Sequence, residues 1–403
     1  MRILLISDVS IHLVSSGAER VLYEHSTRLA KRGHEVHVLT RRLPEHGEET
    51  STINGVREWR YRFPSKRICQ ICKSTFFDCR QLFSFLIRKY SFDVINLYQP
   101  LSGLGTFPSP VSSHIPKVYT CFSFAFEEFV SRNSLPTHPG RRLIFQAHLL
   151  GRKLVEKVLI NRSKRIVVLS EYTKRRLKEV YGLHGSRITV IPGAVDIDRF
   201  KPAGERALNR RQLGISPNCS VLLTVRNLEP RMGLENLIFA FKKVVENQPD
   251  AFLIIGGKGP LEQKLRDLAS NCGLAESIRF TGYIAEDALP AYYRIADLFI
   301  LPTRELEGFG LVTVEALASG LPVLGTPVGG TQEILTHLGP GFLFNDSTPD
   351  SMAELILETL RTWTRDTSAH QKVSKRCRRL AERHYSWEDH ITQLESLFQS
   401  TCA

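Results

Sequence analysis

Two carboxylates flank a glycine-rich turn in the segment 302–315, Pro-Thr-Arg-Glu-Leu-Glu-Gly-Phe-Gly-Leu-Val-Thr-Val-Glu. Glu307 comes directly before the Gly-Phe-Gly turn at 308–310, and Glu315 comes five residues after it. The glycines let the backbone approach a ligand, and the first free amides of the following helix, with its dipole, favour an anion such as phosphate. At about 1.5 Å per residue, Glu315 lies roughly 7 Å further along that helix. The two carboxylates could therefore hold two different hydroxylated groups of one ligand.

Taken alone, this segment fits equally well a helix capped by Glu307 with Glu315 in solvent. Two arginines favour the ligand interpretation, because Arg226 follows the expected strand 221–225 and Arg231 lies five residues later. Two guanidinium groups at the carboxyl end of a strand can form paired hydrogen bonds to phosphate oxygens. The simpler alternative for these arginines is a surface ion pair with a neighbouring glutamate.

Two more glycine turns follow expected strands, at 256–259, which includes Gly257, and at 329–330. Glycine is weak evidence by itself, because tight turns need it for steric reasons. The carboxyl ends of parallel strands, however, meet at one edge of a sheet, where open sheets of this kind bind ligands. We therefore expect both turns to line the same cleft as Arg226 and Glu307.

Short apolar runs alternate with segments of helical periodicity along most of the chain. The run 3–6 is followed by a glycine turn, a helix over 18–32 and a strand over 35–40, and such units recur up to residue 191. After a polar stretch the pattern restarts with the strand 220–225 and continues, through a strand over 298–301 and a helix over 311–318, to residue 325. Alternating strands and helices predict parallel sheets with both faces covered, here in two domains divided near residue 200.

The composition is that of a globular chain with more than one domain: 403 residues, 42% hydrophobic and 24% charged. The net charge of +13 is uneven, since residues 1–200 hold 32 basic and 17 acidic side chains. This excess predicts an anionic partner, and composition leaves open nucleic acid, an anionic membrane surface or a phosphate-bearing substrate. Eight dispersed cysteines indicate a reducing compartment. No run of eighteen apolar residues occurs, so we expect any membrane contact to be peripheral.

The chain resembles the family 4 retaining glycosyltransferases. These have the GT-B architecture, an α/β fold in which two Rossmann-like, doubly wound parallel-sheet domains face one another. The resemblance implies an acceptor-side domain over 1–200, a nucleotide-sugar-binding domain over 201–380, and a C-terminal helix over 381–403 that crosses back to the first domain. The matching segments lie at 16–20, 170–172, 191–196, 226–233, 257–261 and 307–331.

The resemblance implies transfer of a hexosyl unit from a UDP- or GDP-sugar to an acceptor hydroxyl with retention, in polysaccharide, lipopolysaccharide or glycolipid synthesis. In the catalytic set, Arg226 and Arg231 would neutralise the leaving diphosphate, and Glu307 would contact the hydroxyls of the donor sugar. Glu315 would hold the ribose, and Gly17 would approach the diphosphate from the first domain. The remaining donor-binding residues are Gly257, Gly308, Phe309, Gly310 and Leu311.

One position departs from the family pattern. Family members often have a histidine after the strand that corresponds to 118–120, where this chain has Phe122. A phenyl ring cannot hydrogen-bond a sugar hydroxyl, so either the donor or the activity differs, with His12 and His114 as possible substitutes on the acceptor side. Two alternatives therefore stay open: a sugar-nucleotide epimerase of the same architecture, and a nucleotide-sugar-binding module without catalysis.

Two patterns imitate metal sites. Asp196-Ile197-Asp198 resembles an Asp-x-Asp metal motif, but it precedes a turn, where aspartate is a favoured cap. Cys69, Cys72 and Cys79 are not completed to four zinc ligands by a further cysteine or histidine pair. We expect no metal and no cofactor, because the nucleotide sugar is a substrate.

The segment 57–90 combines nine basic and two acidic side chains with eight aromatic ones. This mixture suits an anionic membrane surface, and it equally suits core aromatics beneath a solvated basic face. No nucleic-acid-binding motif accompanies it, so we expect no nucleic acid. We expect a cytoplasmic protein with a carbohydrate or lipid-linked acceptor, peripheral on the cytoplasmic membrane face if 57–90 binds lipid.

Overall fold

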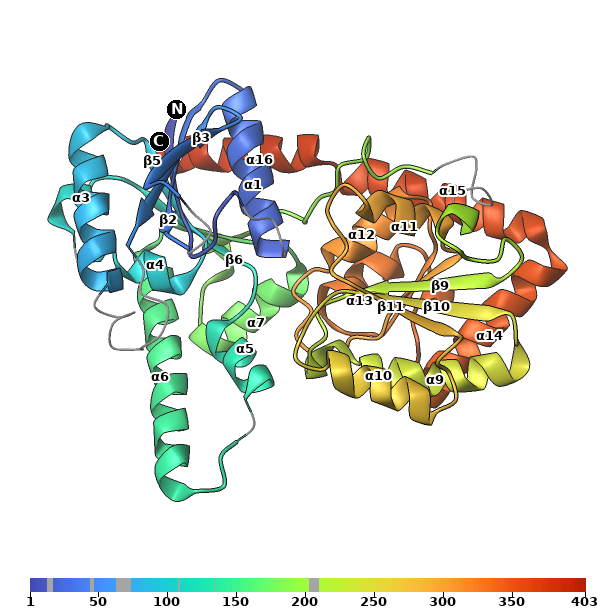
Figure 1. Cartoon of the computed structure of the whole chain (residues 1–403). Coiled ribbons are helices and arrows are strands. Elements are labelled where there is room, and N and C mark those ends of the chain that lie inside the picture. Colours follow the sequence, from blue (N-terminus) through green and yellow to red (C-terminus); the bar gives the residue numbers. More distant parts are fainter. Residues whose placement is uncertain (13–16, 44–46, 63–73, 108, 134, 203–209) are drawn as a thin grey trace. The chain divides into compact units, whose positions relative to one another are not determined.

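The computed structural model describes residues 1–12, 17–43, 47–62, 74–107, 109–133, 135–202 and 210–403 (Figure 1). The chain divides into two compact units, Met1–Ile191 with Glu388–Ala403, and Pro192–Trp387. Among the described residues, each unit contains one sheet, and every pair of neighbouring strands is parallel except one pair at the edge of the first sheet. The predicted fold class, α/β with two Rossmann-like parallel-sheet domains, is confirmed.

The first unit has an eight-stranded sheet in the order β3-β4-β2-β1-β5-β6-β7-β8. The side chains of Ile3–Ile6 in β1 are buried on both faces, as a parallel strand between two helical layers requires. β3 and β4 form an antiparallel hairpin around Asn54 and Gly55, whose positive φ angles of 47° and 81° suit a two-residue hairpin turn. The strands are β1 (Arg2–Ile6), β2 (Glu35–Arg41), β3 (Thr50–Ile53), β4 (Val56–Tyr61), β5 (Val94–Leu97), β6 (Lys117–Cys121), β7 (Arg165–Val168) and β8 (Ile188–Val190).

Helices pack against this sheet, and α7 shows how the local sequence sets their ends. Ser170 accepts a hydrogen bond from the amide of Thr173 at its start, and Gly182 ends it with a φ of 65°. One core cluster joins alternate strand residues to side chains of α3, α6 and α7. The helices of this unit are α1 (Gly17–Lys31), α3 (Arg80–Lys89), α4 (Pro100–Leu104), α5 (Ala125–Arg132), α6 (Pro139–Arg162), α7 (Glu171–Tyr181) and α16 (Trp387–Cys402).

The C-terminal helix α16 packs against the first unit from Glu388 onward. His390 Nε2 lies 2.7 Å from His25 Nε2 in α1, and His25 Nδ1 lies 2.6 Å from the hydroxyl of Tyr98. Burial, followed by the neighbouring His390, lowers the pKa of His25. Arg32 adds a hydrogen-bonded ion pair to Glu395 at 2.8 Å. Side chains from the two ends of the sequence thus hold α16 in place.

The second unit has a five-stranded parallel sheet in the order β11-β10-β9-β12-β13. In Figure 1, α9, α10 and α14 lie on one face of this sheet and α11, α12 and α15 on the other. The predicted strands 220–225 and 298–301 and the predicted helix 311–318 are confirmed at both ends. The strands are β9 (Ser220–Val225), β10 (Ala251–Gly256), β11 (Ile278–Gly282), β12 (Leu298–Leu301) and β13 (Val323–Gly325), and the helices are α9 (Leu234–Asn247), α10 (Glu262–Asn271), α11 (Leu289–Ile295), α12 (Leu311–Ala318), α13 (Gly329–Thr336), α14 (Pro349–Arg365) and α15 (Thr367–His384).

The chain passes between the units at 191–192 and 387–388, where the sequence suggested 200–201 and 380–381. Both differences have one physical cause, because the two crossing segments pair with each other inside the second unit. The amide of Val195 donates to the carbonyl oxygen of Tyr385 at 2.8 Å. The segment from 192 to 200 therefore belongs to the second unit.

Candidate functional site

Several loops meet at the carboxyl edge of the second sheet. β9, β10, β12 and β13 are parallel, so the residues that follow them lie along one edge. Arg226 follows β9, Gly257 follows β10, the loop 302–310 follows β12, and the turn 329–330 follows β13. β9 and β12 are neighbours, so Arg226 and Glu307 extend from adjacent strands. The structure thus brings these predicted residues together.

Arg226 and Glu307 form a buried ion pair at this edge. Arg226 Nη2 lies 2.6 Å from Glu307 Oε2, and the two side chains are 5% and 10% exposed. Thr303 Oγ1 donates a further hydrogen bond to Oε2 at 3.2 Å. Within the described part of the chain, Arg226 Nε is buried and has no hydrogen-bond partner. A buried cationic donor without an acceptor is costly, so this edge is suited to receive an anionic ligand.

Arg231 holds the loop that carries Glu307. Its Nη1 donates to the carbonyl oxygen of Leu306 at 2.9 Å, and its Nε lies 3.8 Å from a carboxylate oxygen of Glu229. Leu306 has a φ of 59°, a left-handed conformation that costs a residue with a side chain roughly 1–3 kcal/mol. The hydrogen bond from Arg231 therefore helps to keep this strained residue in place directly before Glu307. The diphosphate contact of Arg231 stays a prediction.

Glycine is required at two of the turns because backbone segments touch there. A Cβ at Gly257 would lie 1.8 Å from the carbonyl oxygen of Arg226, and one at Gly329 would lie 1.9 Å from that of Glu307. Both glycines also have positive φ angles, 128° and 60°. These contacts fix the turns against the chain segments that carry the ion pair. Backbone packing therefore explains why residue 257 is a glycine, and the contact of Gly257 with the donor stays a prediction.

The helix α12 begins at the same edge, with Gly310 before it at a φ of 91° and with Gly308 and Leu311 half-buried. A Cβ at Gly310 would lie 2.7 Å from Thr331 Oγ1 and 3.1 Å from Thr313 Oγ1. Both hydroxyl oxygens are buried, and the described residues give them no hydrogen-bond partner. Two such hydroxyls beside the start of a helix are a second candidate site for hydrogen bonds to a ligand. The sequence interpretation missed both threonines, although each lies close in sequence to a glycine turn that it singled out.

Glu315 and Phe309 both point into the protein. Glu315 is 2% exposed, and its Oε2 accepts a hydrogen bond from the hydroxyl of Tyr293 at 2.9 Å. This burial excludes the alternative in which Glu315 is a solvated surface residue. The ring of Phe309 lies 5.8 Å from the ring of Tyr385. On its other contact, a Cβ added at Gly193 would lie 2.4 Å from the ring of Phe309. The side chain of Phe309 thus anchors the Gly-Phe-Gly turn.

Of the residues predicted in the first unit, Phe122 lies at the carboxyl edge of the sheet and His114 at the opposite edge. Phe122 follows β6, and its ring lies 5.9 Å from the ring of Tyr98. Gly17 is exposed and is the first residue of α1. His114 precedes β6 and so lies at the opposite, amino-terminal edge, which makes it unable to replace a histidine at the position of Phe122.

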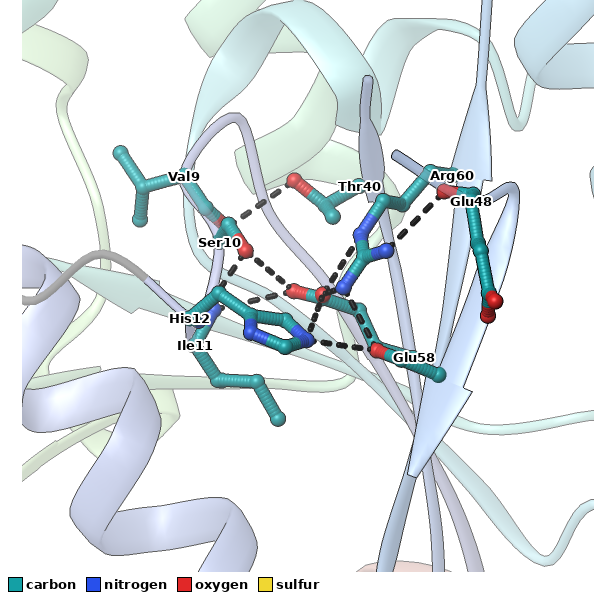
Figure 2. A network of polar contacts seen from close by, with 9 residues as sticks. Val9, Ser10, Ile11, His12, Thr40, Glu48, Glu58 and Arg60 are labelled. Atoms are coloured by element: carbon teal, nitrogen blue, oxygen red, sulfur yellow. Dashed lines mark hydrogen bonds and ion pairs between the residues drawn. The ribbon is translucent and has the colours of Figure 1, made fainter. Parts of the chain in front are cut away.

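A buried network holds the segment that follows β1 (Figure 2). Oε1 of Glu58 in β4 accepts hydrogen bonds from Ser10 Oγ at 2.7 Å and from the amide of Ile11 at 2.9 Å. Oε2 accepts from Arg60 Nε at 2.8 Å, and Nε2 of His12 lies 4.0 Å from it. Glu58 thus fixes the path of the chain up to His12. The sequence interpretation missed Glu58 and Arg60, whose spacing of two places both side chains on one face of a strand.

The two metal-like patterns differ in how much of each the structure describes. Asp196 Oδ1 accepts hydrogen bonds from the amides two and three residues later, at 3.1 and 3.0 Å, which is the turn geometry that the sequence suggested. Cys69 and Cys72 lie outside the described residues, while Cys79 is buried with Sγ 3.6 Å from a backbone carbonyl oxygen. No group of three metal-ligating side chains converges among the residues that the structure describes.

The basic aromatic segment 57–90 is divided between core and surface, with 63–73 outside the described residues. Tyr61 and Phe83 are buried in the core of the first unit, whereas Phe77 is exposed. The core alternative therefore holds for part of the segment, and its contact with a membrane stays a prediction. None of the described helices combines the length and hydropathy that a membrane span needs.

Two family models match the chain. The model described as "Glycosyl transferases group 1" matches residues 205–383, and the model described as "Glycosyltransferase Family 4" matches residues 15–199. The first match includes Arg226, Glu307 and Glu315, and the second includes Gly17 and Phe122. Together the two models account for both structural units.

Curated proteins similar to this chain include a GDP-mannose-dependent alpha-(1-6)-phosphatidylinositol monomannoside mannosyltransferase of Mycobacterium tuberculosis. It is 34% identical over 204 residues, which cover 48% of this chain and 52% of that relative. A D-inositol 3-phosphate glycosyltransferase of Corynebacterium glutamicum is 28% identical over 404 residues, which cover 96% of this chain and 93% of that relative. The chain thus spans about half the length of the mycobacterial relatives that it matches.

Solved structures with the same fold include sucrose-phosphate synthase from Thermosynechococcus elongatus, with a TM-score of 0.83 at 20% identity, covering 99% of this chain and 98% of that one. The Anabaena protein HepE, in complex with UDP and glucose, has a TM-score of 0.77 at 19% identity, with 99% and 100% covered. At these identities the similarity establishes the fold.

Proposed function

We propose, because this chain belongs to the family 4 glycosyltransferases, that it transfers a hexosyl unit from a nucleotide diphosphate sugar to an acceptor hydroxyl. The observation that supports this proposal most strongly is the buried pair of Arg226 and Glu307, in which Arg226 Nε has no partner among the described residues. A diphosphate oxygen would supply the acceptor that this nitrogen lacks. The charge-assisted hydrogen bond would be stronger than one between neutral groups.

The proposed reaction is electrostatic in character. The bond between the anomeric carbon and the diphosphate oxygen breaks, and a bond from the same carbon to the acceptor oxygen forms on the same face. Because the new bond forms on the face that the diphosphate leaves, the anomeric configuration is retained, and the acceptor proton moves to the leaving phosphate oxygen. Arg226, Arg231 and the first amides of α12 would stabilise the charge that builds on the diphosphate. With these groups in place, we propose that no metal ion is required.

The carboxylates would hold the two ends of the donor. Hydrogen bonds within the described residues engage only Oε2 of Glu307, which leaves Oε1 for a sugar hydroxyl. Glu315 would hold the ribose, with its orientation set by Tyr293. Gly17, in the first unit, would contribute a close backbone approach to the diphosphate.

The proposed acceptor is based on the substrates of the similar curated proteins. Those relatives are a GDP-mannose-dependent enzyme acting on a phosphatidylinositol mannoside and a glycosyltransferase acting on inositol 3-phosphate. We therefore propose an acceptor in glycolipid synthesis. From the family resemblance we also propose cell-surface polysaccharide synthesis as an alternative, and a cytoplasmic enzyme that works at the membrane face. Both UDP- and GDP-hexoses are candidate donors, since HepE binds UDP and the mycobacterial relative depends on GDP-mannose.

The test is a donor screen with the full chain, followed by transfer to glycolipid acceptors and nuclear magnetic resonance of the product. We expect one donor to raise thermal stability, by about 2.7 kcal/mol at a hundred times its dissociation constant. The product should keep the donor's anomeric configuration, with EDTA present or absent. Arg226→Ala should slow transfer by about a hundredfold or more.

Other outcomes of this screen would contradict the proposal. An isomerised donor in the absence of an acceptor would identify an epimerase. Donor binding without transfer to any acceptor would identify a binding module, consistent with Phe122 in place of the family histidine. Inversion at the anomeric carbon, or activity that EDTA abolishes and manganese restores, would contradict the proposed mechanism.

A further inference from the structure

The exposed apolar side chains of the described residues are concentrated in one part of the first unit. Thirteen of the described large hydrophobic residues are exposed, and seven of these lie between residues 130 and 158, on α5, on α6 and in their connection. The most exposed is Leu143 at 69%. Contiguous exposed apolar side chains on one element mark an interaction surface more often than chance exposure does.

Four of these side chains form a stripe along α6. They are spaced by seven, four and four residues, which places them within about 80° of the helix circumference at 100° per residue. The buried residues Phe145, Glu156 and Leu159 lie on the opposite face, which packs against the first unit. Figure 1 shows the amino-terminal half of α6 reaching beyond the sheet of this unit. The stripe consists of Leu143, Leu150, Leu154 and Val158.

The exposed charges on α6 have one sign. Its 24 residues contain six arginines and lysines and one acidic residue, Glu156, which is fully buried. Lys153 and Lys157 are exposed and lie within about one quarter turn of the stripe. The exposed surface of α6 therefore combines an apolar stripe with cations and offers no carboxylate.

We propose that the α6 stripe docks on an anionic membrane surface. A helix of this kind can lie in the interface with its apolar side chains among the acyl chains, while lysine stems extend to the phosphates. Each basic residue near an anionic membrane adds further attraction. A second copy of this chain is a poorer occupant, because two such stripes would bring Lys153 and Lys157 close to their equivalents. This surface is distinct from the segment 57–90, and the proposal does not depend on the proposed activity.

The test is flotation of the full chain with vesicles of phosphatidylglycerol and phosphatidylcholine, compared with vesicles of phosphatidylcholine alone. We expect salt-sensitive binding to the anionic vesicles. Leu150→Gln with Leu154→Gln should lower the partition coefficient about tenfold or more, because two apolar contacts with the acyl region are lost. Lys153→Gln with Lys157→Gln should lower it by about tenfold and weaken its dependence on salt.

A charge-matched control comes from α15 in the second unit. Lys372 and Arg379 are exposed there, and none of the described residues of α15 is an exposed large apolar residue. Lys372→Gln with Arg379→Gln removes the same charge as the lysine variant and should change binding less than about threefold. An equal loss in this control would overturn the proposal, since binding would then follow net charge alone. So would unchanged binding of the leucine variant, or a dimer of the wild-type chain that the leucine variant loses. Flotation needs no nucleotide sugar, so a failed transfer assay leaves this result unaffected.

Discussion

Each unit buries a carboxylate beside an arginine near the carboxyl ends of its strands. The two pairs differ in how many of their hydrogen-bonding groups are left without a partner among the described residues. In the first unit, both oxygens of Glu58 accept hydrogen bonds, and Arg60 also donates to a backbone carbonyl and a serine hydroxyl. In the second unit, Glu307 uses one oxygen for Arg226 and Thr303, and Arg226 Nε has no partner among the described residues.

This difference separates a structural ion pair from a candidate binding pair. Burial and charge are similar in the two places, so neither would distinguish them. Unused bonding capacity does, because a buried polar group without a partner is costly unless a ligand completes it. The first pair fixes the segment after β1, whereas we propose that the second binds a diphosphate.

The largest expected effect tests the first pair. Glu58→Ala leaves the guanidinium of Arg60 buried without its carboxylate, which should lower the free energy of unfolding by about 3–5 kcal/mol. Urea unfolding, with hydrogen exchange on peptides of the first unit, measures this loss. Nucleotide affinity should stay within about twofold, because all the groups proposed to bind the donor, apart from the backbone at Gly17, lie in the other unit. Glu49→Ala, which removes an 80% exposed carboxylate, is the control and should cost less than about 0.5 kcal/mol.

A loss below about 1 kcal/mol in Glu58→Ala would show that the closed network contributes little to stability. A loss of nucleotide binding in a folded variant would contradict the division of roles between the two pairs.

A third buried carboxylate, Glu156, extends the comparison because its hydrogen-bond partners are the hydroxyls of Tyr181 and Tyr119, at 2.7 and 3.2 Å. Burial raises the pKa of Glu156 to about 7. The folded state therefore binds this proton more tightly than the unfolded state. Its contribution to stability is complete below the ordinary glutamate pKa and is lost as the pH rises through about 7, by up to about 3 kcal/mol.

Glu156→Gln should remove this part of the pH dependence. We expect the unfolding free energy of the wild type to fall relative to that of the variant as the pH rises from 5 to 8. Urea titrations at several pH values measure the slope. Parallel stability curves for the two proteins would show that Glu156 has an ordinary pKa in the folded state and is ionised there.

The smallest expected effect concerns Tyr293 and Glu315. Tyr293→Phe removes a hydrogen bond to a buried carboxylate, which should cost about 1 kcal/mol of stability. If Glu315 holds the ribose, the variant should also weaken binding of UDP or GDP severalfold, which a purely structural hydroxyl would not do. Tyr283→Phe, at a 46% exposed tyrosine, is the control. Unchanged nucleotide affinity in the Tyr293 variant would separate this hydroxyl from the binding site.

Much of the second unit could be predicted from sequence, because buried parallel strands and glycine turns leave strong local patterns. The strands 220–225 and 298–301 and the meeting of Arg226 with Glu307 follow from that pattern and from the parallel order of strands. The hairpin of β3 and β4 also has a local signal, because Asn54-Gly55 strongly favours a two-residue turn.

Other features depend on tertiary contacts that no local pattern encodes. The network of Glu58 requires β4 beside β2 and the segment after β1 folded over both. The left-handed conformation of Leu306 is not a preference of leucine, and Arg231 helps to hold it. The periodicity of α6 can be found in the sequence, but which of its apolar residues remain exposed depends on what the first unit covers.

The most direct test of the central claim is calorimetric titration of UDP and GDP into the full chain and into Arg226→Ala. Arg266→Ala, which removes an exposed arginine paired with Glu262, serves as the control for charge. Melting curves confirm that each variant is folded. Arg226→Lys keeps the charge but loses the paired donors of the guanidinium, so its nucleotide affinity should lie between those of the wild type and the alanine variant. We expect Arg226→Ala to weaken the preferred nucleotide about tenfold or more and Arg266→Ala to stay within about twofold of wild type. A folded Arg226→Ala variant that binds the nucleotide as tightly as the wild type would contradict the account.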